Sequence, residues 1–174
     1  LQELAGDLRV AVVEGDLFTT KDAARIERCG APVVQINTSG GCHLDAAMVA
    51  AALDRLDLDA FDLLVIENVG NLVCPAEFAL GEDEKAVVLS ITEGDDKPLK
   101  YPLIFKESAA AVLSKVDILP YTNFDMASAR ADITALHPGI ALFPVSCQTG
   151  EGLADWYAWL RAQVAAKKAG KEVR

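Results

Sequence analysis

"FDLLVIENVG", residues 61–70, decides the fold that we expect, because its four consecutive apolar residues lead straight into a polar loop. A strand that is apolar without alternation is typical of a parallel sheet buried on both faces. Five more strands of this kind are predicted within residues 9–16, 32–37, 85–96, 109–117 and 140–146. Segments of helical period separate most of them, at residues 19–30, 44–56, 100–108, 124–136 and 152–169. The sequence therefore predicts an α/β fold, with a mostly parallel sheet covered by helices on both faces.

The composition is typical of a single globular domain that spans residues 1–174. A chain of this length with 52% hydrophobic residues can bury about two-thirds of its unfolded surface. Its formal net charge of -10 disfavours nucleic acids and anionic membrane surfaces as partners. No apolar run reaches the roughly 18 residues of a membrane span. The four cysteines lie in apolar or glycine-rich surroundings, which is typical of free thiols in a reducing cytoplasm, where we expect the protein to reside.

Polar clusters follow the predicted strands, and their order along the chain indicates a nucleotide site. In a parallel sheet the carboxyl ends of the strands share one edge, where functional loops gather. One strand leads into SKVD at residues 114–117, and a later strand leads into SCQTG at residues 146–150. The Asp117 carboxylate can accept hydrogen bonds from the ring N–H and the exocyclic amine of guanine, while the Lys115 stem can pack over the base. This pair of loops resembles the base-recognition half of a GTPase.

The stretch SGGCHLD places a thiol beside an imidazole, at Cys42 and His43. Taken alone, such a pair is more often structural, because free cysteine usually serves as a small core residue. Gly40 and Gly41 free the loop to bring two adjacent side chains to one ion, and thiolate and imidazole suit zinc or nickel. Cys74 follows another strand of the same sheet edge. From these residues alone, both a metal site and a packing role remain open.

Six polar motifs run in order along nearly the whole chain: VEGD, NTSGGCHLDAAMV, DLLVIENVGNLVCP, ITEGDD, SKVD and SCQTGEG. In this order they resemble the HypB family, the GTPases that help insert nickel into [NiFe]-hydrogenase. The resemblance implies a P-loop NTPase fold of the SIMIBI class, with residues 1–174 forming part of its G domain. It also implies a GTP-dependent homodimer that holds a nickel or zinc ion between its subunits.

The resemblance assigns roles to individual residues. Cys42 and His43 match the metal-binding pair of the family, and Cys74 matches its third, nearby ligand. Asp16 and Glu67 match carboxylates that hold Mg²⁺ or its waters and orient an attacking water. Without the resemblance, these two acids are ordinary loop residues at strand ends. The loop after Asp16, as far as residue 20, is expected to act as a switch.

The same resemblance implies a guanine site and two protein partners. Lys115 and Asp117 are expected to bind the base of GTP, with Ser146 and Cys147 offering backbone or hydroxyl contacts to it. Ser114 stands where the family usually has asparagine, and its shorter side chain is expected to weaken guanine binding. The implied partners are a nickel-delivery protein of the HypA type and the hydrogenase large subunit.

The phosphate-binding motif G-x-x-x-x-G-K-[S/T] does not occur in the 174 residues, although GTP hydrolysis in this family requires it. Because the chain starts with leucine, we expect this motif, its strand and the first helix to precede residue 1. That strand normally lies in the middle of the sheet, so an exposed gap between two strands is expected. Two hypotheses follow. The chain is either part of a nickel-inserting GTPase, not hydrolytic by itself, or a non-hydrolysing module for metal storage or delivery.

Overall fold

The computed structural model of the chain describes residues 1–16 and 21–170. It divides into two compact units, Leu1–Gly81 and Glu82–Arg174, each with a sheet of its own. The predicted switch at residues 17–20 lies outside the described residues. Within the described part of the chain, no helix is both long and apolar enough to cross a membrane.

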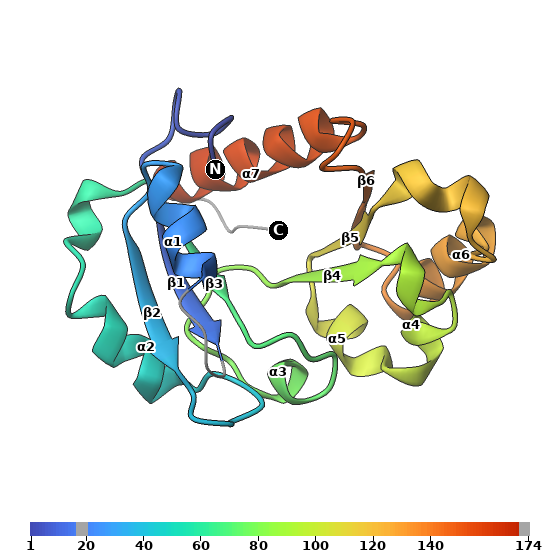
Figure 1. Cartoon of the computed structure of the whole chain (residues 1–174), viewed down its shortest axis with the longest axis horizontal. Coiled ribbons are helices and arrows are strands. Elements are labelled where there is room, and N and C mark those ends of the chain that lie inside the picture. The colour runs from blue at the N-terminus through green and yellow to red at the C-terminus, as the bar shows by residue number, and fades with distance from the viewer. Residues whose placement is uncertain (17–20, 171–174) are drawn as a thin grey trace. The chain divides into compact units, whose positions relative to one another are not determined.

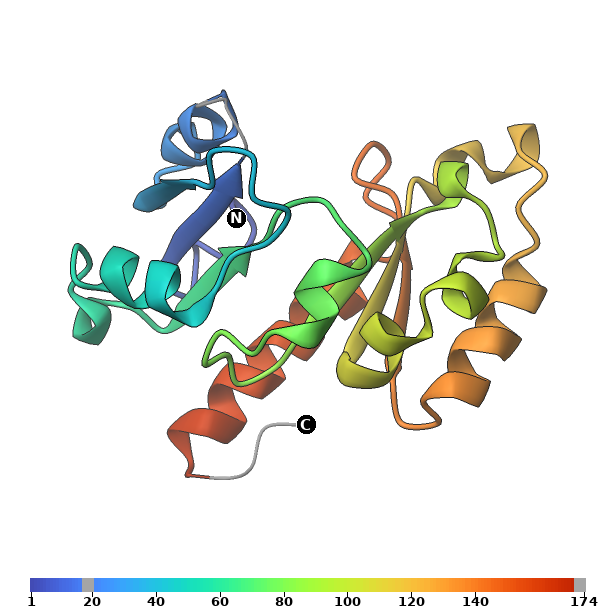
Figure 2. The ribbon, with the colours of Figure 1, turned by 90° about the horizontal axis from the view of Figure 1, so that it is seen from below.

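The first unit is built on a three-stranded parallel sheet in the order β2-β1-β3 (Figure 1). Its central strand is buried because it is paired on both sides and covered on both faces. The helices α1 and α2 lie on opposite faces of this sheet (Figure 2). The elements of this unit are β1 (Val10–Asp16), α1 (Lys21–Arg28), β2 (Val33–Asn37), α2 (Ala46–Leu53), the 3-10 helix η1 (Leu58–Ala60), β3 (Leu63–Glu67) and α3 (Cys74–Glu77).

One face of this sheet packs under α2 to form a hydrophobic core. Val13 of β1 pairs in register with Val34 of β2 and with Ile66 of β3, so the three side chains share a face. Ala52 of α2 packs on these side chains and completes the cluster. Burial of such a cluster stabilises the unit by about 25 cal/mol for each Å² of apolar surface removed from water.

The second unit holds a three-stranded parallel sheet in the order β4-β5-β6. Helix α7 lies on one face of it, and α4, α5 and α6 lie on the other (Figure 2). Trp156 and Trp159 of α7 pack on Phe143 of β6, with ring centroids 5.3 and 6.0 Å from the Phe143 ring. The elements of this unit are β4 (Ala86–Ser90), the 3-10 helix η2 (Ile91–Glu93), α4 (Lys97–Lys100), α5 (Pro102–Glu107), β5 (Ala110–Ser114), the 3-10 helix η3 (Val116–Tyr121), α6 (Met126–Leu136), β6 (Ala141–Val145) and α7 (Leu153–Lys168).

All six predicted strands and all five predicted helices are present, and every strand pairing is parallel. The single sheet with a gap that the sequence predicts is observed as two separate sheets, in which β3 and β4 are each paired on one side only. In β4, Val88 has a side chain that is 61% exposed, so one face of this strand is less covered than the other. The short helices α3 and α4 were not predicted, because four residues are too few to show a helical period.

Candidate metal and nucleotide sites

The loop between β2 and α2 is tied down where it leaves the sheet. The Thr38 N–H donates to the carbonyl of Asp16 at the end of β1 (3.0 Å), and the Thr38 hydroxyl donates to the carbonyl of Gly41 (2.8 Å). Ser39 and Gly40 have φ angles of 51° and 94°, so the chain turns sharply between these bonds. Glycine adopts this left-handed backbone at no steric cost, whereas serine pays about 1 kcal/mol for it.

Leu44 anchors the other end of the loop. Its side chain is fully buried, and its N–H donates to the side-chain oxygen of Asn68 (2.8 Å). The Leu44 side chain lies directly over Gly15 of β1, where an added Cβ would come within 2.8 Å of it. Cys42 and His43, which directly precede Leu44, therefore extend from a loop that is fixed on both sides.

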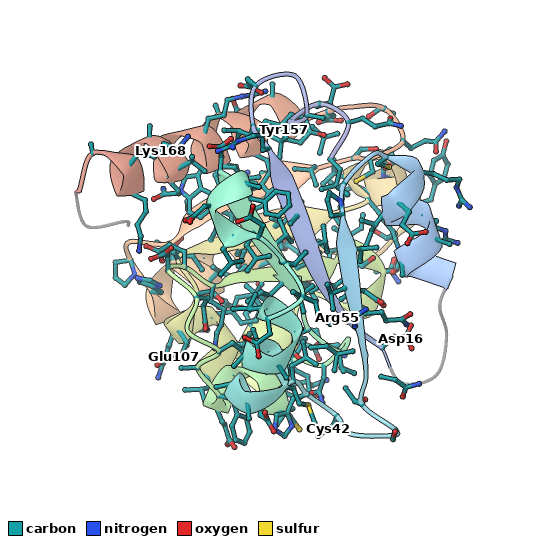
Figure 3. The ribbon with its side chains drawn as sticks, turned by 90° about the vertical axis from the view of Figure 1, so that its left-hand side faces the viewer. Asp16, Cys42, Arg55, Glu107, Tyr157 and Lys168 are labelled. Carbon is teal, nitrogen blue, oxygen red and sulfur yellow. The ribbon has the colours of Figure 1, made fainter. Side chains whose placement is uncertain are left out.

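These two side chains meet Cys74, the first residue of α3. The Cys42 thiol lies 2.9 Å from the Cys74 sulfur and 3.5 Å from Nδ1 of His43. All three ligand atoms lie within 4.8 Å of one another. Figure 3 shows Cys42 on its loop beyond the end of β2, with the sulfur atom in yellow. The structure thus brings together the three residues that the sequence predicts as metal ligands.

The donor set of this cluster suits a zinc or nickel ion, since both metals take thiolate and imidazole ligands. Two sulfurs that ligate one zinc ion tetrahedrally lie about 3.7 Å apart, given Zn–S bonds of about 2.3 Å. The Cys42 and Cys74 sulfurs, at 2.9 Å, therefore need to separate by less than about 1 Å. Cys42 is exposed and both thiols are free, so this movement meets little resistance. The hydrogen bond to Cys74, with partial desolvation, raises the pKa of the Cys42 thiol above its ordinary value.

An aromatic ring orients the imidazole of this cluster. The Phe78 ring stacks on His43 with a centroid distance of 4.0 Å and an angle of 12° between the planes. Phe78 is 39% exposed, so the stack lies at the surface. Stacking of this kind restricts rotation of the imidazole and leaves its edge, which carries the ring nitrogens, free to face the sulfurs.

The predicted magnesium-site carboxylates both lie at strand ends of the first unit. Asp16 is the last residue of β1 and is half-buried, and Glu67 is the exposed last residue of β3. In the sheet register Glu67 lies opposite Glu14, a third carboxylate that is only 3% exposed. Their placement on adjacent strands at one sheet edge is the arrangement that the sequence predicts. The contacts of Asp16 and Glu67 with magnesium and with an attacking water stay predictions.

The predicted guanine site lies in the second unit, where β5 and β6 end side by side. The buried Ser146 hydroxyl donates to Oδ1 of Asp117 (2.6 Å). The Ser146 oxygen in turn accepts from the N–H groups of Gln148 (3.2 Å) and Thr149 (3.1 Å). This network fixes the Asp117 carboxylate, which follows β5, to the loop that follows β6. The Ser146 hydroxyl is thus committed to Asp117, so the predicted hydroxyl contact of Ser146 with the base stays a prediction.

Lys115 and Cys147 are both exposed beside this network. Lys115 has a left-handed backbone, with a φ angle of 67°, which is rare for a residue other than glycine. Such strained positions persist where the surrounding structure imposes them and are concentrated at functional sites. Ser114, the last residue of β5, lies opposite Ser90 of β4 and Val145 of β6.

Comparison with known proteins identifies the family. Residues 1–144 match the family described as "CobW/HypB/UreG, nucleotide-binding domain". The hydrogenase maturation factor HypB of Escherichia coli K12 is 51% identical over 163 residues, which cover 94% of this chain. The crystal structure of HypB from Helicobacter pylori in complex with nickel superposes with a TM-score of 0.90 at 39% identity, covering 95% of this chain and 80% of that one. The chain belongs to the HypB family.

A second HypB structure, from Archaeoglobus fulgidus, superposes with a TM-score of 0.87 at 34% identity and covers 94% of this chain and 79% of that one. These likenesses confirm the predicted fold and the predicted family. The chain spans about half the length of the curated relatives that it matches, 56% of the Escherichia coli protein and 54% of the one from Azotobacter vinelandii.

Sequence reasoning missed the residues that support the HypB-family motifs. Phe78, which stacks on His43, is one example, and the two asparagines of the ENVGN stretch are others. Ser146 was predicted as a site residue, but its bond to Asp117 was not. Asn68 bonds to Leu44, and Asn71 bonds to both cysteine-bearing segments. The alternation of asparagine with small residues in ENVGN was the one available signal, since asparagine side chains commonly hydrogen-bond to nearby backbone groups.

Proposed function

We propose that this chain is the metal-binding and guanine-binding part of a nickel-insertion factor for [NiFe]-hydrogenase. The observation that carries the proposal is the cluster of Cys42, His43 and Cys74, whose ligand atoms lie within 4.8 Å of one another. Two thiols and an imidazole meet at the surface only because hydrogen bonds hold the loops that carry them in place. The names of the relatives, hydrogenase maturation factors and one nickel complex, support the same function.

In this proposal the metal is cargo that the cluster receives and releases. Cys42 is exposed, and Cys74 and His43 are half-buried, so a partner protein can reach the ion. Three donors leave a fourth position in the coordination shell of Ni²⁺ or Zn²⁺. In a homodimer the second copy brings equivalent donors, so that one ion lies between two subunits and takes ligands from each. A nickel-delivery protein of the HypA type supplies the ion, and the hydrogenase large subunit receives it.

The nucleotide in this proposal is GTP with Mg²⁺. Asp117, held by Ser146, accepts both guanine donors, and the Lys115 stem covers the base. Asp16 and Glu67 hold Mg²⁺ or its waters and orient the attacking water. The roles of all four residues rest on the family match and on their positions at strand ends.

The 174-residue polypeptide by itself is proposed not to hydrolyse GTP. It contains no G-x-x-x-x-G-K-[S/T] motif to surround the phosphates, which supplies most of the electrostatic stabilisation in phosphoryl transfer. The alternative function is a non-hydrolysing metal storage or delivery module, which the same metal cluster favours. Steady release of phosphate by the purified chain, abolished by Asp16→Ala, would contradict the proposal that the chain alone does not hydrolyse GTP. It would also contradict the alternative of a non-hydrolysing module.

A reducing compartment such as the cytoplasm is part of the proposal. The Cys42 and Cys74 sulfurs lie 2.9 Å apart as free thiols. An oxidising compartment would convert a pair this close into a disulfide, and the thiolates would no longer be available to the metal.

The proposal is tested by competitive titration of Ni²⁺ and Zn²⁺ against a metal indicator. The wild-type chain is expected to bind one ion per dimer, and Cys42→Ala to weaken binding by at least about 100-fold, since even loss of a residue that supports a ligand costs about 10- to 100-fold. Cys29→Ala and Cys147→Ala are matched controls, because both sulfurs lie outside the cluster. Unchanged metal affinity in Cys42→Ala would contradict the proposal and favour a packing role for Cys42 and His43.

A further inference from the structure

The three proposed metal ligands come from two separate segments of the chain. Cys42 and His43 belong to the loop after β2, whereas Cys74 begins α3, and 31 residues separate the two cysteines in sequence. Thr38 and Leu44 fix the two ends of the loop that carries Cys42, and Gly40 and Gly41 restrict the backbone between these ends little. A pair of thiols 2.9 Å apart in such a setting requires something that connects the two segments.

The side chain of Asn71 makes that connection. Its Nδ2 donates to the backbone carbonyl of Cys42 (3.2 Å). Its Oδ1 accepts from the N–H groups of Val73 (2.8 Å) and Cys74 (3.4 Å). One amide therefore bonds to the backbone of both cysteines, with its donor side on one segment and its acceptor side on the other.

Asn68 makes a different contact, which helps to isolate the role of Asn71. Its Oδ1 accepts from Leu44 (2.8 Å) and from its own neighbour Val69 (2.9 Å). This anchors the loop after His43 but does not reach Cys74. Asn37 is more local still, since its Oδ1 accepts only the nearby Ser39 N–H (2.8 Å) in the bonds that the structure describes.

We propose that Asn71 is a positioning residue that holds the Cys42 and Cys74 thiols together as a preformed pair before any ion arrives. The inference rests on the proposed function, because it explains how that metal cluster is kept ready. With the amide in place, the entropic cost of ordering the glycine-rich loop on ion binding is small. Without it, the bond from Asn68 to Leu44 still joins the two segments, but Cys42 itself loses its bond to the Cys74 segment, and ion binding has to bring the sulfurs together.

The experiment measures, without nickel, how readily the Cys42 and Cys74 thiols bind one arsenic atom together. Phenylarsine oxide binds tightly where two thiolates can reach one arsenic atom, and weakly to a single thiol. Its affinity for the reduced 174-residue chain is compared among the wild type, Asn71→Ala, Asn71→Asp and Asn37→Ala, with Cys74→Ser as the single-thiol reference. Circular dichroism and the unfolding midpoint of each variant ensure that titrations are made on folded protein.

The expected loss is about fivefold for Asn71→Ala, because one net hydrogen bond between the segments is worth about 1 kcal/mol and a factor of ten about 1.4. Asn71→Asp keeps both acceptor bonds but loses the donor to Cys42, so its loss is expected to be several-fold. Asn37→Ala should stay within about twofold of the wild type, since its lost bond lies within one segment. Wild-type affinity in Asn71→Ala, or an equal loss in Asn37→Ala, would overturn the assignment.

A nickel titration of the same variants separates this inference from the proposed function. If both hold, Asn71→Ala weakens nickel binding in parallel with arsenical binding, because both need the two thiols to be close together. A wild-type chain that binds the arsenical but no nickel would overturn the proposed function and leave the Asn71 assignment standing. A variant with weak nickel binding but wild-type arsenical affinity would overturn the assignment alone.

Discussion

The metal cluster of the first unit and the guanine site of the second unit are built in opposite ways. The cluster consists of side chains near the surface, such as the exposed Cys42, held through the backbone of the loops that carry them. At the predicted guanine site a fully buried hydroxyl, that of Ser146, bonds directly to the Asp117 carboxylate, which is proposed to accept hydrogen bonds from the base. The cluster is therefore suited to move when an ion enters or leaves, whereas the guanine site is suited to keep one geometry.

This difference has a physical origin in burial. A short hydrogen bond beneath the surface is poorly screened by water and holds its partners firmly. The exposed Cys42 sulfur has no buried bond of this kind, and the backbone bonds of its loop still allow it to move by the fraction of an ångström that an ion requires. The predictions below affect one site more than the other, and two of them use the other site as an internal control.

The largest effect is expected from Asp117→Asn. The change replaces one carboxylate acceptor by an amide donor, so the site should reject guanine and accept xanthine, which has a carbonyl where guanine has an amine. The ratio of guanosine to xanthosine affinity is expected to change by at least about 100-fold, because a mismatched buried hydrogen bond is costly. Nuclear magnetic resonance titration with the two nucleosides measures this ratio. Equal binding of adenosine and guanosine by the wild type would contradict the assignment of Asp117.

A change of pH should affect the metal site far more than the guanine site. The hydrogen bond to Cys74 raises the pKa of the Cys42 thiol, so protons occupy this sulfur at neutral pH and have to leave when an ion binds. Apparent zinc affinity should therefore fall about tenfold for each released proton when the pH drops from 8 to 7. Guanosine binding over the same range serves as the control. A zinc affinity that is independent of pH would rule out thiolate ligands.

Ser146→Ala is expected to weaken guanosine binding about tenfold, because Asp117 loses the bond that fixes one of its oxygens. The same change should lower the free energy of unfolding by about 1 to 2 kcal/mol, since the N–H groups of Gln148 and Thr149 also lose their acceptor. Urea unfolding and nucleoside titration measure the two effects. Zinc affinity should be unchanged, and a parallel loss of zinc binding would show that the two sites are not independent.

The smallest effect is expected from Lys115→Gly. Glycine adopts the left-handed backbone of this position without strain, which favours the folded state, but it also gains freedom in the unfolded chain. The net change in unfolding free energy should stay within about 1 kcal/mol, while guanosine binding falls because the stem over the base is gone. A large destabilisation would mean that the Lys115 side chain has a structural role.

The sequence predicted those parts of the molecule that are encoded locally. Apolar runs identified every strand, and the glycine hinge beside Cys42 indicated a metal ligand, although only the family resemblance decided in favour of metal over packing. The division into two sheets depends on which strands find partners, which is a property of the whole chain. The contact between Phe78 and His43 joins residues 35 positions apart, and an exposed phenylalanine carries no local sign of such a partner.

The most direct test of the account is zinc K-edge X-ray absorption on the zinc-loaded 174-residue chain, with Cys42→Ala measured beside it. The central claim is that Cys42, His43 and Cys74 bind one ion together. It predicts sulfur scatterers at about 2.3 Å and nitrogen at about 2.0 Å from the metal, with the sulfur contribution reduced in the variant. A shell of oxygen and nitrogen alone, or a sulfur contribution that survives unchanged in Cys42→Ala, would contradict it.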